Sequence, residues 1–284
     1  MSNLTGGGGK FKVKKSRKQS ILLYKNGEQF STDQPTIIEE PLSIRIEGNP
    51  YSVVMRTPGD EIAHVAGFFL AEGLIDSPKD IATIGFCTEE GTNVATVTLT
   101  DDRKNKVADL LDRKGFVSQT SCGICGKEMV NDLHQITTPV NNSLKISLDQ
   151  VSECAEHLSS FQPLHKKTRS AHAALIFDMD LQVLASAEDV GRHNALDKAI
   201  GKVFMDKQIL NARFGIMSSR LSYELVQKAA RAGLEMLVGV SRPTSLGVDL
   251  ARAVNMTLVC ARGDDLMIFC GKKRLISPKD KSTI

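Results

Sequence analysis

Residues 214–260 read FGIMSSRLSYELVQKAARAGLEMLVGVSRPTSLGVDLARAVNMTLVC, and in them short apolar runs alternate with longer segments of helical period. The apolar runs have the length of buried strands and are Phe214 to Met217, Met236 to Val240 and Met256 to Cys260. The segments between them are expected to be helices, at Leu221 to Ala232 and Thr244 to Val254. Strands that alternate with helices predict a parallel sheet covered by helices, and hence an α/β protein.

Further elements are expected on both sides of this segment. The carboxyl-terminal half predicts paired strands, a helix and a last strand, at Ala173 to Phe177, Gln182 to Ser186, Asp189 to Phe204 and Leu266 to Phe269. The amino-terminal half predicts a hairpin and two more strands, at Leu42 to Ile46, Tyr51 to Met55, Ile81 to Cys87 and Val94 to Thr100. Its helices are expected from a cap at Asp60 to about Leu74, and over Lys104 to Arg113.

These patterns divide the chain into three parts. Residues 1–20, rich in Gly and Lys, are expected to be a flexible basic tail. Residues 21–145 are expected to form a smaller α+β domain, which includes a loop with Cys122 and Cys125. Residues 146–284 are expected to form an α/β domain with a mostly parallel sheet.

Composition excludes several classes of protein. The net charge is +3, and much of the excess lies in the first 18 residues, so the remainder is close to neutral and a nucleic-acid binder is not expected. No stretch approaches the roughly 20 apolar residues that span a bilayer, and the first residues lack the apolar core of a signal peptide. We therefore expect a cytoplasmic protein, whose six cysteines are thiols.

The segment Ser121 to Gly126, SCGICG, is the clearest chemical motif. A reachable thiolate is a strong nucleophile, and it can carry a transferable sulfur atom as a persulfide. Glycines beside Cys122 and Cys125 let the backbone expose both sulfurs, and the charge of Lys127 favours a thiolate. The motif therefore makes Cys122 and Cys125 candidates for a reactive thiol that could carry sulfur.

Three other interpretations of this cysteine pair stay open on spacing alone. The first is half of a four-ligand zinc site. The other two ligands would need a second close pair, and the chain has neither a second C-x-x-C nor an H-x₃-H. A thioredoxin-type dithiol would follow the first strand of a βαβ unit, whereas here a long polar loop precedes the motif. The third interpretation is a purely structural pair.

Each predicted parallel strand is followed by one arginine. These are Arg220, Arg242 and Arg262, and the first two strands lead into helix starts that carry Ser or Thr. Ligands of open α/β sheets bind at the carboxyl ends of the strands, where guanidinium groups and helix amides suit phosphate oxygens. The pattern predicts a large anionic ligand such as a nucleotide diphosphate, held without a standard phosphate loop. The alternative is that these residues are solubilising arginines and ordinary caps.

The segment Glu188 to Lys198, EDVGRHNALDK, is unusually polar for the start of a helix. His193 and Asp197 share a helix face, and Asp189 is expected to cap the helix. Arg192, His193 and Asn194 could then line the ligand cleft, although a helical His is often structural.

His172 could suggest a zinc deaminase, which needs a Glu two residues after its His and a Pro before its first Cys. The chain has Ala174 and Ser121 at these positions, so deaminase chemistry is not expected.

Several motifs together resemble the FdhD family of sulfur carrier proteins needed by formate dehydrogenase. They span residues 39–270 in order and are Glu40 to Leu42, Thr57 to Asp60, Ala71 to Gly73, Ser121 to Gly126, Glu188 to Lys198, Tyr223 to Gly233 and Pro243 to Leu246. The resemblance implies that persulfide sulfur is taken from a cysteine desulfurase and passed to the bis-molybdopterin guanine dinucleotide cofactor of formate dehydrogenase. It also implies a homodimer.

The resemblance assigns residues to these roles. Cys122 would carry the persulfide, and Cys125 matches the second cysteine of the motif. The cofactor-binding stretch would be Cys260, Ala261, Arg262, Gly263, Asp264 and Asp265, and a guanine nucleotide such as GDP would bind there as well. The carboxyl-terminal domain would have a cytidine-deaminase-like fold without its metal. The alternative function is a non-catalytic chaperone that only binds and delivers the cofactor.

The chain departs from the family pattern in two places. Arg169-Ser170-Ala171 stands before His172 where a glycine-bearing segment is expected. Cys260 stands at the usual aromatic position of the cofactor stretch, where a ring would stack on guanine.

Overall fold

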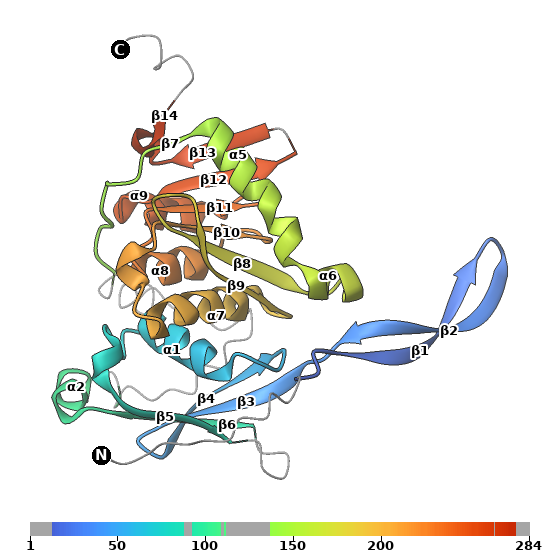
Figure 1. The fold of residues 1–284 in the computed structure, drawn as a ribbon, viewed down its shortest axis with the longest axis horizontal. Coiled ribbons are helices and arrows are strands. Elements are labelled where there is room, and N and C mark those ends of the chain that lie inside the picture. Colours follow the sequence, from blue (N-terminus) through green and yellow to red (C-terminus); the bar gives the residue numbers. More distant parts are fainter. Residues whose placement is uncertain (1–12, 88–92, 109–110, 112–136, 264, 277–284) are drawn as a thin grey trace.

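The computed structural model describes residues 13–87, 93–108, 111, 137–263 and 265–276 (Figure 1). Cys122 and Cys125, with the loop predicted around them, lie outside these residues, and so does Asp264. None of the helices in the described ranges is both long and apolar enough to cross a membrane.

A sheet of six strands forms the centre of the carboxyl-terminal half (Figure 1). Its order across the sheet is β13 (Asp265–Cys270), β12 (Thr257–Arg262), β11 (Met236–Gly239), β10 (Phe214–Met217), β8 (His172–Phe177) and β9 (Val183–Asp189). The pairs β10–β11 and β11–β12 are parallel, while the other three pairs of neighbouring strands are antiparallel. The expectation of a mostly parallel sheet is therefore wrong. The turns after β8 and β12 are short, and short connections can join only antiparallel strands.

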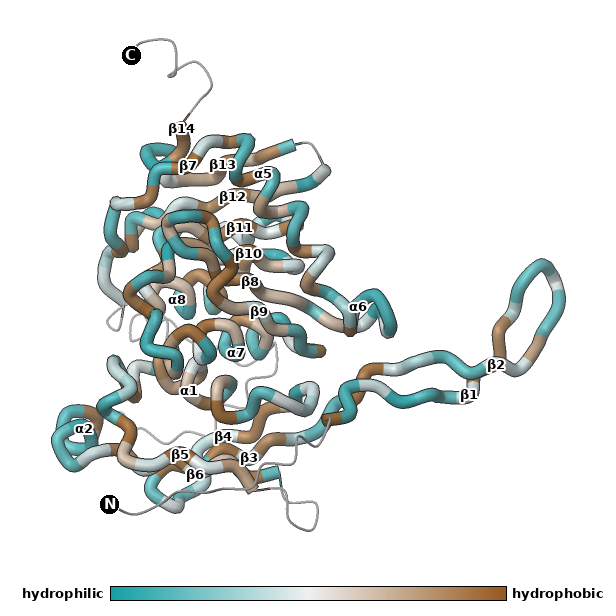
Figure 2. The backbone as a smooth tube through the Cα atoms, in the orientation of Figure 1, coloured by the Kyte–Doolittle hydropathy of each residue, from teal (hydrophilic) through white to brown (hydrophobic). Residues whose placement is uncertain are grey.

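Helices cover both faces of this sheet. On one face lie α7 (Arg192–Met205), α8 (Tyr223–Arg231) and α9 (Ser245–Ala253), whereas α5 (Leu148–His157) packs on the other. Side chains alternate along β10, so that Phe214 and Ile216 face α5 and Met217 faces the opposite core. Figure 2 shows that apolar residues concentrate in these central strands. The alternation of strands and helices predicted for residues 214–260 is confirmed.

A second unit precedes this one. Its sheet has the order β4 (Asn49–Arg56), β3 (Glu40–Ile46), β6 (Val94–Leu99) and β5 (Ile81–Cys87), and helix α1 (Glu61–Ala71) packs on it. The predicted hairpin is β3 and β4, and strand β5 has the predicted bounds. The short helix α2 (Asp101–Lys106) follows β6.

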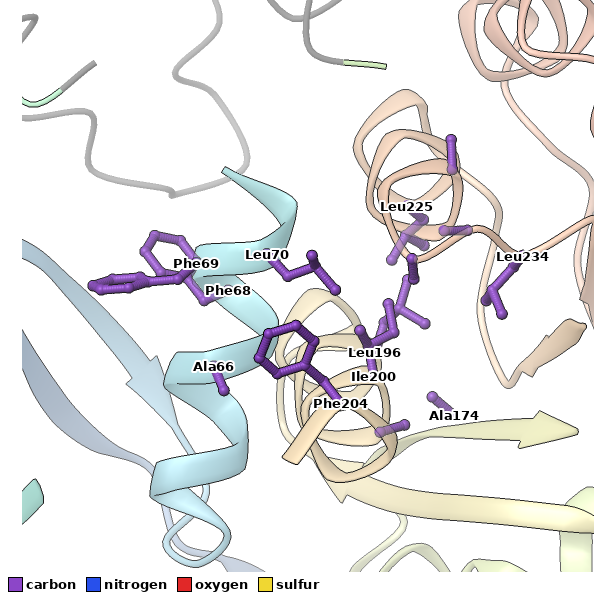
Figure 3. Close-up of a cluster of buried hydrophobic side chains, with 14 of the residues drawn as sticks. Ala66, Phe68, Phe69, Leu70, Ala174, Leu196, Ile200, Phe204, Leu225 and Leu234 are labelled. Atoms are coloured by element: carbon purple, nitrogen blue, oxygen red, sulfur yellow. The ribbon is translucent and has the colours of Figure 1, made fainter. Parts of the chain in front are cut away.

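The two units share one hydrophobic core, because α1 crosses α7 at close range (Figure 3). In this view Leu70 lies on the side of α1 that faces Leu196 and Phe204 of α7. The crossing depends on two glycines: a Cβ on Gly67 would collide with the carbonyl oxygen of Asp197, and one on Gly201 with that of Ala63. The absence of a side chain at Gly67 and Gly201 therefore allows α1 and α7 to pack in backbone contact.

A long hairpin projects from the body of the protein (Figure 1). It consists of β1 (Ser16–Lys25) and β2 (Glu28–Ile37), paired along their whole length. The turn between them is Asn26-Gly27, and both residues have positive φ, as a tight hairpin turn requires. The tail expected over residues 1–20 is therefore wrong from Ser16 onward, because cross-strand pairing orders this polar segment.

Three other predicted bounds differ. Asp60 precedes α1 with φ of 62° and makes no capping hydrogen bond through its side chain, and the helix ends at Ala71. Helix α7 begins at Arg192, because Asp189 is the last residue of β9. Helix α2 begins at Asp101 and ends at Lys106, while Ala108 and Leu111 are again helical, so the helix predicted over Lys104 to Arg113 lies partly outside the described residues. The remaining short elements are η1 (Pro78–Asp80), β7 (Ile146–Ser147), η3 (Leu158–Phe161), α6 (Pro163–Thr168), η4 (Ile209–Asn211), η5 (Lys272–Arg274) and β14 (Leu275–Ile276).

Candidate functional site

One edge of the six-stranded sheet collects polar strand ends. The three parallel strands β10, β11 and β12 finish there. Strand β8 is antiparallel to β10, and β13 is antiparallel to β12, so both start at this edge. Strand β9 is antiparallel to β8 and therefore ends at this edge. The edge therefore brings together residues that lie up to about a hundred positions apart, at the place where open α/β sheets bind ligands.

A cavity of about 530 Å³ opens at the β11 and β12 end of this edge, and we call it the arginine cavity. Its lining consists of Val240, Ser241, Arg242, Cys260 and Arg262. Both arginines are exposed, and within the described residues neither forms an ion pair. The cavity therefore presents two positive charges that no described carboxylate pairs with, as an anionic ligand requires.

The structure separates the three arginines that the sequence grouped. Arg242 and Arg262 share the arginine cavity, but Arg220 is not part of its lining. Arg220 follows β10 and is exposed. The helix start beside the cavity is already capped, because Thr244 Oγ1 accepts a hydrogen bond from the Gly247 amide of α9. Phosphate recognition here would therefore depend on the two guanidinium groups.

The predicted cofactor stretch forms the end of β12 and its turn. Cys260 is part of the lining of the arginine cavity and is inaccessible to solvent. Burial raises the pKa of its thiol, although Arg242 and Arg262 act against this shift. Ala261 is buried on the α5 side of the sheet, and Gly263 makes the turn with φ of 57°. Asp265 opens β13 and is exposed.

A second polar group occupies the β8 end of the same edge. Nδ1 of His172 lies 3.4 Å from Oγ of Ser218, which accepts a hydrogen bond from the Ala173 amide at 2.8 Å. Burial and the nearby charge of Arg192 lower the pKa of His172 below its usual value. Its surroundings therefore favour the neutral form of His172 over the charged one. Arg169, in the segment before it, has φ of 59°, a conformation that glycine adopts more easily.

His193 lies beside this group and pairs with a residue that the sequence did not single out. Its Nε2 is 3.0 Å from Oε2 of Glu224 and 3.4 Å from Oγ of Ser222. The hydrogen bond between His193 and Glu224 lowers the pKa of Glu224. Glu224 belongs to the next helix, α8, so no spacing within α7 could have indicated the pair.

Asp189 and Asn194 hold the fold together rather than line the cleft. The Asp189 carboxylate accepts hydrogen bonds from the amides of Thr57 and Gly191, from Asn194 Nδ2 and from Lys198 Nζ. Asn194 Nδ2 also donates to the carbonyl of Met55. The expectation that Asn194 contacts the ligand is therefore not supported by its position.

Asp197 is likewise separated from His193. Its carboxylate is buried and receives two hydrogen bonds of 2.9 Å from the ammonium group of Lys228. This pair lies in the core between α7 and α8, away from solvent. The helical spacing of His193 and Asp197 thus has no common function.

Nothing among the described residues assembles a metal site, because no three His, Cys, Asp or Glu side chains there are placed to bind one ion. This observation does not extend to Cys122 and Cys125, which lie outside those residues.

Comparison with known proteins gives a consistent result. A family model described as FdhD/NarQ family matches residues 37–276. Proteins named sulfur carrier protein FdhD are similar along most of their length. The one from Mycobacterium tuberculosis is 37% identical, with 88% of this chain and 95% of the relative covered. The one from Sulfurisphaera tokodaii is 32% identical, with 92% and 99% covered.

A solved structure from Desulfotalea psychrophila, whose description names a formate dehydrogenase accessory protein, has the same fold. The TM-score is 0.73, and the match covers 92% of this chain and 99% of the other at 23% identity.

Proposed function

Since the chain belongs to the FdhD/NarQ family, we propose that it is a cytoplasmic sulfur carrier for formate dehydrogenase. It accepts persulfide sulfur from a cysteine desulfurase and delivers it to the bis-molybdopterin guanine dinucleotide cofactor, which is the substrate of the transfer. Relatives that share 31–37% of their residues with this chain carry the name of sulfur carrier, which supports the proposal. The resemblance makes a homodimer the expected form.

The sulfur is carried by Cys122. Its thiolate attacks the outer sulfur of the desulfurase persulfide, a bond forms between the two sulfurs, and the desulfurase cysteine leaves as a thiolate. Cys122 then holds the sulfur as a persulfide. Cys125 assists or resolves this intermediate, because its thiolate can attack Sγ of Cys122, which forms a Cys122–Cys125 disulfide and releases the outer sulfur as sulfide.

The arginine cavity receives the nucleotide part of the cofactor. Among the described residues, this cavity is the feature that best supports the proposal. Arg242 and Arg262 lie together at the carboxyl edge of the parallel strands and have no ion-pair partner among the described residues. Two guanidinium groups without counterions fit the phosphate oxygens of a guanine dinucleotide. GDP would occupy the same cavity.

The cavity also supports a second candidate, a chaperone that binds the cofactor without transferring sulfur. The cysteine in the cavity, Cys260, is buried and its pKa is raised, so it is unsuited to carry sulfur. Transfer therefore depends on Cys122, and a protein that needs only the arginine cavity would work without it.

The decisive experiment is activation of formate dehydrogenase by Cys122→Ala and Cys125→Ala variants, tested separately. A carrier loses activation with Cys122→Ala, and wild-type protein gains one sulfur atom at Cys122 after incubation with the desulfurase and cysteine. Cys87→Ala is the matched control, since Cys87 is an exposed thiol at the end of β5. Full activation by Cys122→Ala would exclude the carrier and leave the chaperone.

A further inference from the structure

Arg192 is a half-buried cation that forms no ion pair with any residue the structure describes. Among the described arginines that are shielded from solvent, the other five each lie within 4.0 Å of a carboxylate, and these are Arg56, Arg103, Arg213, Arg231 and Arg274. In the same part of the chain Arg192 forms no ion pair, and its Nε is buried without a hydrogen bond. Shielding a charge without a partner is unfavourable, so this position is suited to an anion that is not part of the fold.

The surroundings of Arg192 add to the positive potential. It is the first residue of α7, a helix of 14 residues with no acidic side chain in its first turn and no side-chain cap. A cation at this end opposes the helix dipole. The nearby carboxylates already have other partners. Glu224 pairs with His193, and Asp189 accepts four hydrogen bonds from backbone and side-chain groups of the protein.

His172 provides a hydrogen-bond donor beside this charge. Because Oγ of Ser218 accepts from the Ala173 amide, its own hydrogen can be donated to Nδ1 of His172. A neutral imidazole that accepts at Nδ1 carries its proton on Nε2. Nε2 of His172 is then a donor at the sheet edge, where His172 pairs with Asp189 across β8 and β9 and the chain reaches Arg192 three residues after Asp189.

We propose that His172 and Arg192 form a second anion-binding subsite, which binds an oxyanion of the size of a phosphate. Arg192 supplies the charge, His172 supplies a directed N–H, and Ser218 orients the imidazole. The identity of the ligand rests on the proposed function: the oxyanion is a further phosphate of the nucleotide ligand whose other end lies in the arginine cavity. Strand β10 stands next to both β8 and β11, so both subsites lie along one continuous edge.

The imidazole signal of His172 in a nuclear magnetic resonance titration reports on this subsite alone. We expect inorganic pyrophosphate to shift this signal in the full-length protein, and GDP to do the same. The Arg192→Gln variant should bind pyrophosphate at this subsite about tenfold more weakly, as expected for the loss of one charge-assisted hydrogen bond. Arg252→Gln is the control, because Arg252 is an exposed arginine on α9.

The outcomes separate this subsite from the proposed function. A His172 signal that pyrophosphate leaves unchanged at millimolar concentration would overturn the subsite without any variant being needed. Equal GDP affinity of wild type, Arg192→Gln and His172→Asn, with weaker binding by Arg262→Gln, would overturn it while the arginine cavity stands. Failure of the carrier function itself would be seen in the Cys122→Ala activation assay, which does not depend on this measurement.

Discussion

The ammonium nitrogen of Lys198 lies 2.6 Å from Oδ2 of Asp189, and both side chains are inaccessible to solvent. Lys198 also donates to the carbonyl of Thr57, and Asp189 accepts from its amide. The ion pair thereby joins β9 and α7 of one unit to the segment that follows β4 in the other. It fixes the start of α7, and with it the position of Arg192 at the sheet edge.

Removing one member of this pair should destabilise the whole protein. Lys198→Met leaves the Asp189 carboxylate buried without its counterion, which costs about 3–5 kcal/mol for a buried pair. Chemical denaturation measures the free energy of unfolding. Arg252→Met, which removes an exposed cation from an exposed pair, is the control and should change it little. Equal stability of both variants would show that the buried pair contributes nothing.

The crossing of α1 and α7 should not tolerate a methyl group. Gly67→Ala places a Cβ against the backbone of Asp197, so the helices must separate and the core between them must open. Overpacking of this kind costs about 1–3 kcal/mol or more, seen as a lower melting temperature. Gly85→Ala in β5 is the control, since a Cβ there meets no atom within 4 Å. A Gly67→Ala variant as stable as this control would contradict the described crossing.

His64 should make the fold sensitive to acid. It is completely buried on α1, and burial together with Lys198 and Lys228 lowers its pKa well below the usual value. Below a pH of about 6.5 the unfolded chain binds a proton that the folded chain does not, so stability falls as the pH falls, by at most about 1.4 kcal/mol per pH unit for this residue.

Denaturation of the wild type and of His64→Met at several pH values measures this effect. The difference in unfolding free energy between the two proteins should move in favour of the variant as the pH decreases from 7 toward 5. A difference that does not change with pH would show that His64 protonates equally in both states.

Cys260 should react slowly with alkylating reagents in the native protein. It is buried in the wall of the arginine cavity, and its raised pKa leaves little thiolate at neutral pH. Cys87, which is exposed, should be alkylated first, and mass spectrometry of peptides after a short iodoacetamide treatment distinguishes them. Rapid modification of Cys260 in folded protein would mean that the cavity is open to its sulfur.

GDP binding should depend on the two arginines of the cavity. Arg242→Gln and Arg262→Gln each remove a cation that phosphate oxygens would contact, so each should weaken binding about tenfold in titration calorimetry. Arg220→Gln is the matched control, because Arg220 is exposed at the end of β10 but does not line the cavity. Loss of affinity in Arg220→Gln alone would place the ligand elsewhere along the edge.

Local patterns were sufficient for much of the fold. The bounds of β10 and β5 agree with the apolar runs Phe214 to Met217 and Ile81 to Cys87, and Thr244 caps α9 where a cap was expected. The hairpin of β1 and β2 was within reach too, because Asn26-Gly27 is a strong turn signal, but the polar strands around it resemble a tail.

Contacts between distant segments decided the rest, because a short stretch of sequence carries no information about what it packs against. The residue types around Cys122, Arg242 and Arg262 indicated nucleophilic and anion-binding chemistry before any fold was known. Whether strands β8, β9 and β13 ran parallel or antiparallel depended on their short connections and their partners. Only the folded chain could show that Asp189 forms a buried ion pair with Lys198, and that Arg192 has no ion-pair partner among the described residues. A charge becomes a binding site or a structural link according to what tertiary packing places next to it.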